Sequence, residues 1–246
     1  MAEAVGRPFL TAQWRYLAML NFEIDPAVLL PLVPRGTELD AWNGKTFVSM
    51  VGFLFQNTRV LGLSIPFHED FEEINLRFYV RRKGEDGWRR GVVFVKEIVP
   101  RWAIALTARW LYGENYVALP TVNVICRSPD RAENIESMRY CWTFSKRAQF
   151  LELVTRGGPK DFTEGSEEEF IAQHYWGYSA QHGGGTVEYR VDHPPWRVWQ
   201  AASARLDCDV ENLYGREFVK FLATQPSSAF LAEGSAISVY RGVTIV

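Results

Sequence analysis

Polar side chains alternate with apolar ones along residues 71–80, a pattern that could build a site with acid–base chemistry. Glu73, Asn75, Arg77 and Tyr79 occupy every second position. Successive side chains of a β-strand point to opposite faces, so these four would share one face. A carboxylate placed there, Glu73, could act as an acid or a base. The same alternation fits a strand whose polar face lies in water, and the pattern alone does not separate the two interpretations.

A second candidate is Arg15, the only charged residue before Glu23 in the apolar stretch 9–24. Such an arginine either extends its head to the surface or is an inward-facing cation. A buried cation is costly unless it is paired or bound by a ligand. If Arg15 faces inward, its planar guanidinium suits a carboxylate ligand, which it can hold by two parallel hydrogen bonds.

The four histidines do not predict a metal centre, because no compact spacing joins them and no acidic or cysteine cluster completes them. His174 is the notable one, since it ends a capped segment and enters the aromatic run 174–178. Its imidazole could be a pocket acid or base near neutral pH. The alternative is a structural histidine that hydrogen-bonds the rim of a barrel.

Composition excludes several classes of function. The net charge of −2 argues against a broad nucleic-acid surface or a surface for anionic membranes. No apolar run approaches the roughly 20 residues of a membrane helix, and the N-terminus lacks the layout of a signal peptide. Three widely spaced cysteines, Cys126, Cys141 and Cys208, are expected to be free thiols. A cytoplasmic protein is therefore expected.

Two common catalytic patterns have no support. The run Gly183–Gly185 lacks the strand and helix context of a dinucleotide-binding loop. No serine stands in a Gly-x-Ser-x-Gly elbow. No cofactor is implied.

The elements expected around these residues are mostly strands. Helices are predicted at 25–33, 166–174 and 210–222. Residues 103–112 fit either a strand or a helix, and the helical spacing of their apolar residues favours the helix. Strands are predicted at 9–24, 39–42, 45–55, 71–82, 91–99, 122–127, 139–144, 150–155, 186–191, 196–206 and 236–240. No linker or repeat divides the 246 residues. We expect a mainly β (α+β) fold, one antiparallel barrel or cone with a few peripheral helices, as a single domain over 1–246.

The chain resembles the YqjF-like proteins of bacteria, an uncharacterised family. The resemblance rests on five segments that together span nearly the whole chain: 9–25, 67–80, 112–120, 174–178 and 193–196. This family is in turn similar to acetoacetate decarboxylase, which implies a barrel or cone with peripheral helices.

The resemblance implies roles for several residues. Arg15 and Glu73 match an active-site arginine and glutamate of the decarboxylase. The decarboxylase keeps its Schiff-base lysine in a motif that follows an arginine, here Arg109, but Tyr116 or Val117 stands at that place. No lysine lies between Lys96 and Lys146. Because an imine requires an amine nucleophile, decarboxylase activity is disfavoured.

These observations predict one interior pocket where Arg15, Glu73 and Tyr116 converge, with Glu114, Asn115 and His174 at its rim. Glu73, Tyr116 and His174 would be the catalytic group, and Arg15, Arg109, Glu114 and Asn115 would bind ligand. The expected function is binding of, or non-imine chemistry on, a small carboxylate or carbonyl compound, with no nucleic-acid or membrane partner. The alternative is a non-catalytic structural protein with a filled barrel and an Arg15–Glu73 pair. Whether the chain is an enzyme, and whether it forms a homo-oligomer, stays open.

Overall fold

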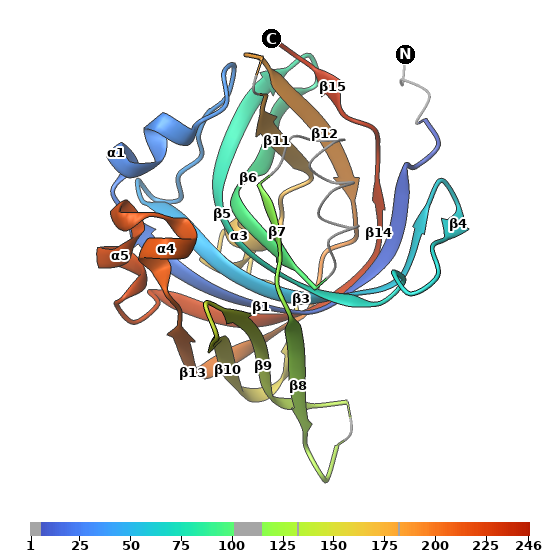
Figure 1. The fold of residues 1–246 in the computed structure, drawn as a ribbon, viewed down its shortest axis with the longest axis vertical. Helices are drawn as coiled ribbons and strands as arrows, with labels where there is room; N and C mark the ends of the chain where they lie inside the picture. The colour runs from blue at the N-terminus through green and yellow to red at the C-terminus, as the bar shows by residue number, and fades with distance from the viewer. Residues whose placement is uncertain (1–5, 101–114, 132, 182) are drawn as a thin grey trace.

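A computed structural model describes residues 6–100, 115–131, 133–181 and 183–246. Its strands form one sheet, in which most neighbours are antiparallel and the β6–β7 and β6–β11 pairs are parallel. The expected mainly β, barrel-like fold is confirmed (Figure 1). The strands are β1 (Leu10–Ile24), β2 (Glu38–Leu39), β3 (Thr46–Val60), β4 (Leu63–Ser64), β5 (Phe71–Gly84), β6 (Gly87–Val99), β7 (Tyr116–Ala118), β8 (Thr121–Arg127), β9 (Ile135–Phe144), β10 (Arg147–Lys160), β11 (Trp176–Ala180), β12 (Thr186–Asp192), β13 (Val198–Asp207), β14 (Ser228–Val239) and β15 (Val243–Thr244).

The sheet closes on itself through β14. Seven strands pair in the cyclic order β12, β11, β6, β5, β3, β1 and β14, and β14 pairs again with β12. The other edge of β14 also pairs with β13, from which the sheet continues through β10 and β9 to β8. The molecule is therefore a closed barrel with a branch made of β13, β10, β9 and β8, which we call the second sheet. Figure 1 shows this branch below the ring.

The short helices follow their capping residues. They are α1 (Pro26–Leu29), the 3₁₀ turn η1 (Leu30–Leu32), α3 (Glu167–Ala172), α4 (Val210–Tyr214) and α5 (Arg216–Leu222). The Asp25 carboxylate accepts a hydrogen bond from the Ala27 amide at 2.9 Å, and the Ser166 hydroxyl accepts one from the Glu169 amide at 3.2 Å. The helix expected at 210–222 is divided at Gly215, whose φ of 115° helical residues do not adopt. The helix predicted over 103–112 lies outside the described residues.

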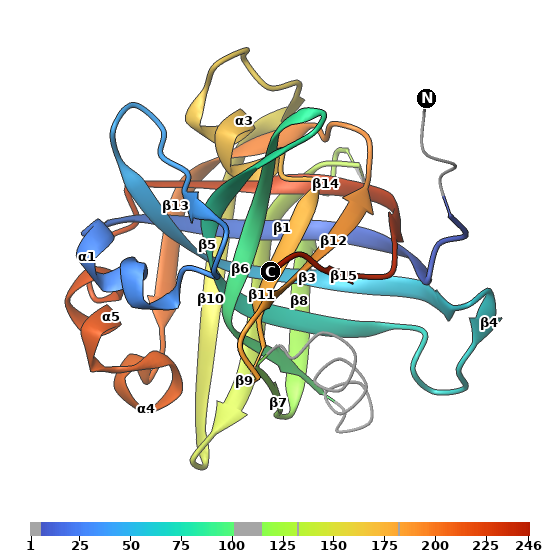
Figure 2. The ribbon, with the colours of Figure 1, turned by 90° about the horizontal axis from the view of Figure 1, so that it is seen from above.

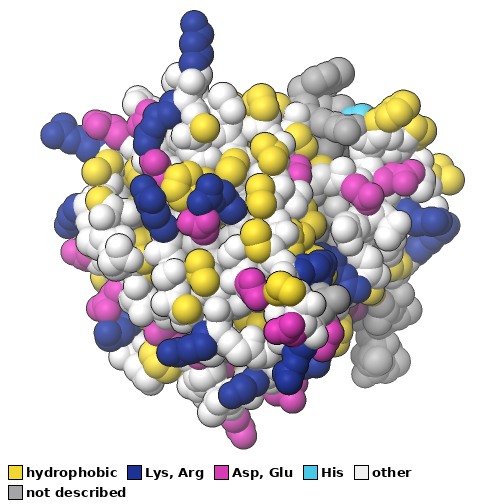
Figure 3. Space-filling view, turned by 90° about the horizontal axis from the view of Figure 1, so that it is seen from below, with side chains coloured by type: hydrophobic (Ala, Val, Ile, Leu, Met, Phe, Trp, Pro, Cys, Tyr) yellow, Lys and Arg dark blue, Asp and Glu magenta, His cyan; other side chains and the backbone are white. Residues whose placement is uncertain are grey.

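The helices α1, α4 and α5 lie at the end of the molecule opposite the β3–β4 hairpin (Figure 2). In Figure 2 α1, α4 and α5 lie at one end, and an arm made by the end of β3 and by β4 projects at the other. Among the described residues, no helix has the length and apolar character that crossing a membrane requires. The face shown in Figure 3 carries basic and acidic side chains interspersed with apolar ones.

The two faces of the barrel wall bury two separate apolar clusters. Leu17, Met19, Phe53 and Phe230 belong to a cluster inside the barrel. On β1, Ala18, Leu20 and Phe22 alternate with Leu17 and Met19 and point to the outside of the barrel. There they pack against β9, β10, β13 and the helices α4 and α5. Both faces of β1 and β3 are thus buried, which is why these strands read as nearly continuous apolar runs.

Candidate functional site

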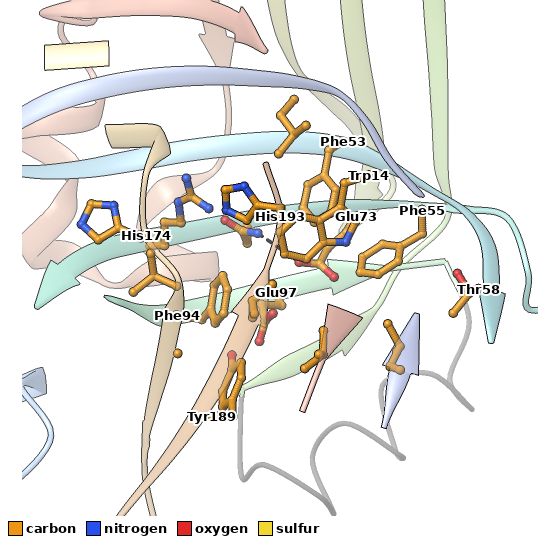
Figure 4. Close-up of a pocket in the computed structure, with 18 of the residues that line it drawn as sticks. Trp14, Phe53, Phe55, Thr58, Glu73, Phe94, Glu97, His174, Tyr189 and His193 are labelled. Atoms are coloured by element: carbon orange, nitrogen blue, oxygen red, sulfur yellow. Dashed lines mark hydrogen bonds between the residues drawn. The ribbon is translucent and has the colours of Figure 1, made fainter. Parts of the chain in front are cut away.

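The barrel contains a cavity of about 300 Å³ that opens to solvent. Most of its described lining is apolar or aromatic, and eight polar side chains also line it: Thr58, His68, Glu73, Asn75, Arg77, Glu97, His174 and His193. Figure 4 shows His174 at one end of the group and Thr58 at the other, with Glu73 and Glu97 between them. A few polar groups in a mostly apolar cavity are typical of a small-molecule site.

Strand β5 supplies the polar wall of this cavity. Glu73, Asn75 and Arg77 are 3%, 1% and 9% exposed, so the interpretation that this face lies in water is wrong. The Asn75 side-chain amide donates a hydrogen bond to the Glu73 carboxylate at 3.0 Å, which orients that carboxylate. Glu97 of β6 lies directly opposite Asn75 in the strand register and is 1% exposed. Two buried carboxylates therefore face the same cavity.

Arg77 is a buried cation with few polar contacts. One Nη donates to the Met19 sulfur at 3.8 Å, and the guanidinium lies 5.8 Å from the centre of the Tyr79 ring. Its Nε has no hydrogen-bond partner in the part of the chain that the structure describes. No carboxylate oxygen of the described residues lies within 4.0 Å of a guanidinium nitrogen of Arg77. Burying a guanidinium without an anionic partner is costly, so an anion bound beside Arg77 would offset that cost.

His174 is almost completely buried at the end of the cavity beyond Arg77. Its ring lies 4.7 Å from the Tyr79 ring and 5.6 Å from the Phe170 ring, centre to centre. Burial lowers its pKa to about 4, although Asp40 opposes this shift, and Arg90 lowers the pKa further. His174 Nε2 lies 3.8 Å from the Asp40 carboxylate, beyond hydrogen-bond distance, while the Arg90 Nε donates to that carboxylate at 2.6 Å. With a pKa of about 4 the imidazole is neutral near pH 7, where it is a weak base.

His193 also lines the cavity, although the sequence did not single it out as a site residue. Its ring stacks on Trp196 at 4.2 Å and on Tyr175 at 4.7 Å between ring centres. Burial lowers its pKa, against the effect of backbone hydrogen bonds with Pro194 and His174. The signal that could have found it is the segment 193–196, which is one of the five segments that carry the family resemblance.

The expected site is brought together only in part. Glu73, Tyr116 and His174 all line the cavity. Asn115 does not, because its side-chain amide donates to the Val95 carbonyl at 3.2 Å. Arg109 and Glu114 lie outside the described residues.

The prediction that Arg15 shares the cavity with Glu73 is wrong. Its guanidinium donates to the Gln13 side chain at 2.9 Å and to the Gly234 carbonyl at 3.5 Å, and it is absent from the cavity lining. A β-bulge explains the difference, because the register of β1 against β3 shifts between Arg15 and Ala18, with Tyr16 at a φ of 54°. Trp14 and Leu17 therefore point inward while Arg15 points outward. Among the described residues, Arg77 is the arginine that lines the cavity.

No lysine is placed for imine chemistry. All six lysines of the chain are among the described residues, and none of them lines the cavity. Lys96, the nearest in sequence to the expected place, donates from Nζ to the Leu213 carbonyl on α4, outside the barrel. Among the described residues, no group of three or more histidine, cysteine, aspartate or glutamate side chains could hold a metal ion.

Solved structures share this fold. Acetoacetate decarboxylase from Legionella pneumophila subsp. pneumophila str. Philadelphia 1 matches with a TM-score of 0.66 and 12% identity, over 98% of this chain and 88% of that one. The enduracididine biosynthesis enzyme MppR, complexed with pyruvate, matches with a TM-score of 0.69 and 13% identity, over 99% and 93%. An acetoacetate decarboxylase-like enzyme from Sphingomonas wittichii RW1 matches with a TM-score of 0.65 and 13% identity, over 100% and 96%. At these identities the likeness shows the fold alone, which is the acetoacetate decarboxylase-like fold.

Sequence comparison agrees with the expected resemblance. The uncharacterized protein YqjF of Bacillus subtilis (strain 168) is 39% identical over 75 residues, which are 30% of this chain and 31% of YqjF. The match thus spans less than a third of either protein. The profile of the family DUF2071, described as uncharacterized conserved protein, matches residues 11–236. Because that match covers most of the chain, the chain belongs to the DUF2071 family.

Proposed function

We propose that this protein binds a small carboxylate or carbonyl compound in the barrel cavity, with Arg77 as the anchor for the negatively charged or polarised oxygen. The observation that carries the proposal is the buried guanidinium of Arg77, whose Nε lacks a hydrogen-bond partner among the described residues. An arginine fork can bind two oxygens of one carboxylate at once, and a ligand anion would compensate the buried charge.

Acid–base chemistry on the bound ligand is the second part of the proposal. Glu73, oriented by Asn75, and the neutral imidazole of His174 would be the proton-transfer groups, and the Tyr116 phenol would donate a hydrogen bond to the ligand. These three residues come from strand β5, from the segment after α3 and from strand β7. The placement of every lysine away from the cavity supports a route that does not pass through an imine.

The cavity disfavours the alternative of a structural protein with a filled barrel. That alternative required a close Arg15–Glu73 pair, whereas Arg15 points outward and contacts Gln13 and Gly234. An interior space of about 300 Å³ lies at the small end of the range of ligand pockets.

Isothermal titration with pyruvate and acetoacetate as probes tests the anchor. We expect Arg77→Met to weaken binding by about 2 kcal/mol or more, roughly thirtyfold in Kd, because the ligand carboxylate would lose its charged partner. Methionine keeps an unbranched side chain of similar length against Met19. Arg15→Met is the matched control, and it should bind as the wild type does. Equal weakening by both substitutions, or none by Arg77→Met, would remove Arg77 as the anchor.

A further inference from the structure

The register of the barrel strands orders the cavity from charged to apolar along its length. Starting at the Arg77 end, Arg77 lies beside Phe94 of β6, and the next position outward, toward the β3–β4 arm, is Asn75, which lies beside Glu97. The position after that pairs Glu73 with Phe53 of β3. Arg77, Glu97 and Glu73 therefore all lie between the Arg77 end of the cavity and the row of residues that follows.

The next row outward is aromatic. Phe55 pairs with Trp14 on one side and with Phe71 on the other, so three aromatic residues cross β1, β3 and β5 at one level. The Phe55 ring stacks on Phe71 at 4.6 Å and meets Trp14 edge to face at 5.8 Å between centres. All three side chains line the cavity. A ligand that reaches Arg77 from this end must pass this row.

Beyond the aromatic row, past the buried Thr58 of β3, the cavity wall is aliphatic. Val60, Leu10, Val239 and Val191 lie side by side across β3, β1, β14 and β12, because each is the register partner of the next. All four line the cavity at the end where the β3–β4 arm projects (Figure 2). Ile65, in the loop after β4, also lines the cavity and is 45% exposed. This end is therefore a mostly apolar mouth, and Thr58 and His68 are the polar residues that line it in the part of the chain that the structure describes.

We infer that the ligand is an amphipathic carboxylate, an acid with an aliphatic or aromatic tail, bound with its head toward Arg77 and its tail across the aromatic row to the apolar mouth. The identity of the head rests on the proposed function, whereas the tail rests on the rows at Phe55 and Val60 alone. A two- or three-carbon acid would leave both rows in contact with water or empty space. A tail that covers them removes its own surface and theirs from water, which is favourable in proportion to the apolar area.

A homologous series separates the two parts of this assignment. Titration of the full chain with butyrate, hexanoate and octanoate should show Kd falling by about fourfold for each added methylene, the value for burying one methylene. A Kd that is the same for all three acids would overturn the tail assignment, even where each acid binds. The matching alcohols, butanol to octanol, report on the tail without the carboxylate.

Two variants locate the tail and the head independently. Val60→Asp places a charge in the aliphatic row and should abolish the gain with chain length. Val122→Asp, on the 53% exposed Val122 of β8, should keep the gain. Arg77→Met should weaken all three acids by one common factor and leave the gain intact. If acids and alcohols of equal length bind equally well and Arg77→Met changes nothing, the proposed anchor fails while the tail assignment stands. A gain that persists in Val60→Asp overturns the tail assignment.

Discussion

At the scale of single residues, burial decides the charge of His174. Asp40, Arg90 and Arg77 are the charged groups that act on it, and only Asp40 favours the imidazolium. The folded pKa of about 4 lies below the ordinary value of 6.5. Between these two pH values the unfolded chain binds a proton that folded His174 does not, so the free energy of unfolding falls as the pH drops from 6.5 toward 4.

This difference predicts a measurable acid sensitivity. At pH 4.5 the wild type should lose roughly 2–3 kcal/mol of its free energy of unfolding relative to pH 7 through His174 alone, because the pKa of this group falls from 6.5 in the unfolded chain to about 4 in the folded one. His174→Phe keeps a ring between Tyr79 and Phe170 and removes the titration. Urea unfolding at the two pH values should therefore show a smaller loss in the variant. Measurement at pH 4.5 stays above the range where Asp40, with its lowered pKa, takes up its proton. The same loss in both proteins would contradict the assignment.

At the scale of elements, the contact between the barrel and the second sheet depends on a glycine. A Cβ at Gly52 of β3 would approach the Tyr140 ring of β9 to 2.6 Å. That ring is fully buried, and its hydroxyl donates to the Tyr16 carbonyl at 2.7 Å, so it cannot move aside freely. Only glycine lets β3 and β9 approach this closely.

Gly52→Ala should therefore lower the free energy of unfolding by about 1–3 kcal/mol, the usual cost of overpacking a core. The measurement is urea unfolding at pH 7. Gly158→Ala, in strand β10, is the matched control, since its Cβ would meet only the Asn134 side-chain oxygen at an ordinary 3.5 Å. A Gly52→Ala protein as stable as the control would show that Tyr140 relocates without cost.

Alternation of side chains predicted the site wherever a strand stays regular. Strand β5 is the clear case, because Glu73, Asn75 and Arg77 share the inner face that period two assigns to them. Capping residues likewise predicted the helix starts after Asp25 and Ser166. Local patterns suffice where the local geometry is standard.

Two bulges explain why the rest of the site could not be predicted. The bulge after Arg15 turns that residue outward, as described above. A second one lies in β6, where the register against β5 skips Val95, so that Phe94 and Glu97 both line the cavity and Lys96 points to α4. Strict alternation from Phe94 would have placed Lys96 inside and Glu97 outside. Nothing in the residue types at these positions marks an extra residue, because a bulge is fixed by pairing with distant strands.

At the scale of the whole molecule, strand β14 joins the barrel to the second sheet. One edge of β14 pairs with β1 along most of its length. Its other edge pairs with β13 near Phe230–Ala232 and with β12 near Ser238–Val239. Ring closure and the branch to the second sheet therefore depend on the same strand. Neither the β12–β14 pairing nor the β13–β14 pairing could have been deduced from the sequence, because each joins ordinary apolar strands about 30 to 50 residues apart in the chain.

We propose on this basis that residues 1–246 unfold as one domain. The outer apolar cluster contains Leu20 and Phe22 from the barrel wall as well as Tyr140, Trp142 and Leu151 from the second sheet. Detaching the second sheet would expose both sides of this cluster, which costs about 25 cal/mol for each Å² of apolar surface. The outer face of the barrel wall is apolar where it contacts the second sheet, and detachment would expose it to water. We therefore expect partial unfolding to be no easier than global unfolding.

Native-state hydrogen exchange in rising urea measures this coupling directly. The most protected amides of β3 in the barrel and of β9 in the second sheet should converge on one opening free energy, with the same dependence on urea. That dependence reports the surface exposed in the opening, so equal slopes mean that both regions open in the same event. The Cys208 thiol provides a second probe, because burial raises its pKa to about 12 and so slows its reaction while the protein is folded. Its labelling rate should follow the same urea dependence as the two strands. Amides of β9 that open with a smaller slope than those of β3 would show that the second sheet detaches by itself, and the single-domain assignment would then be wrong.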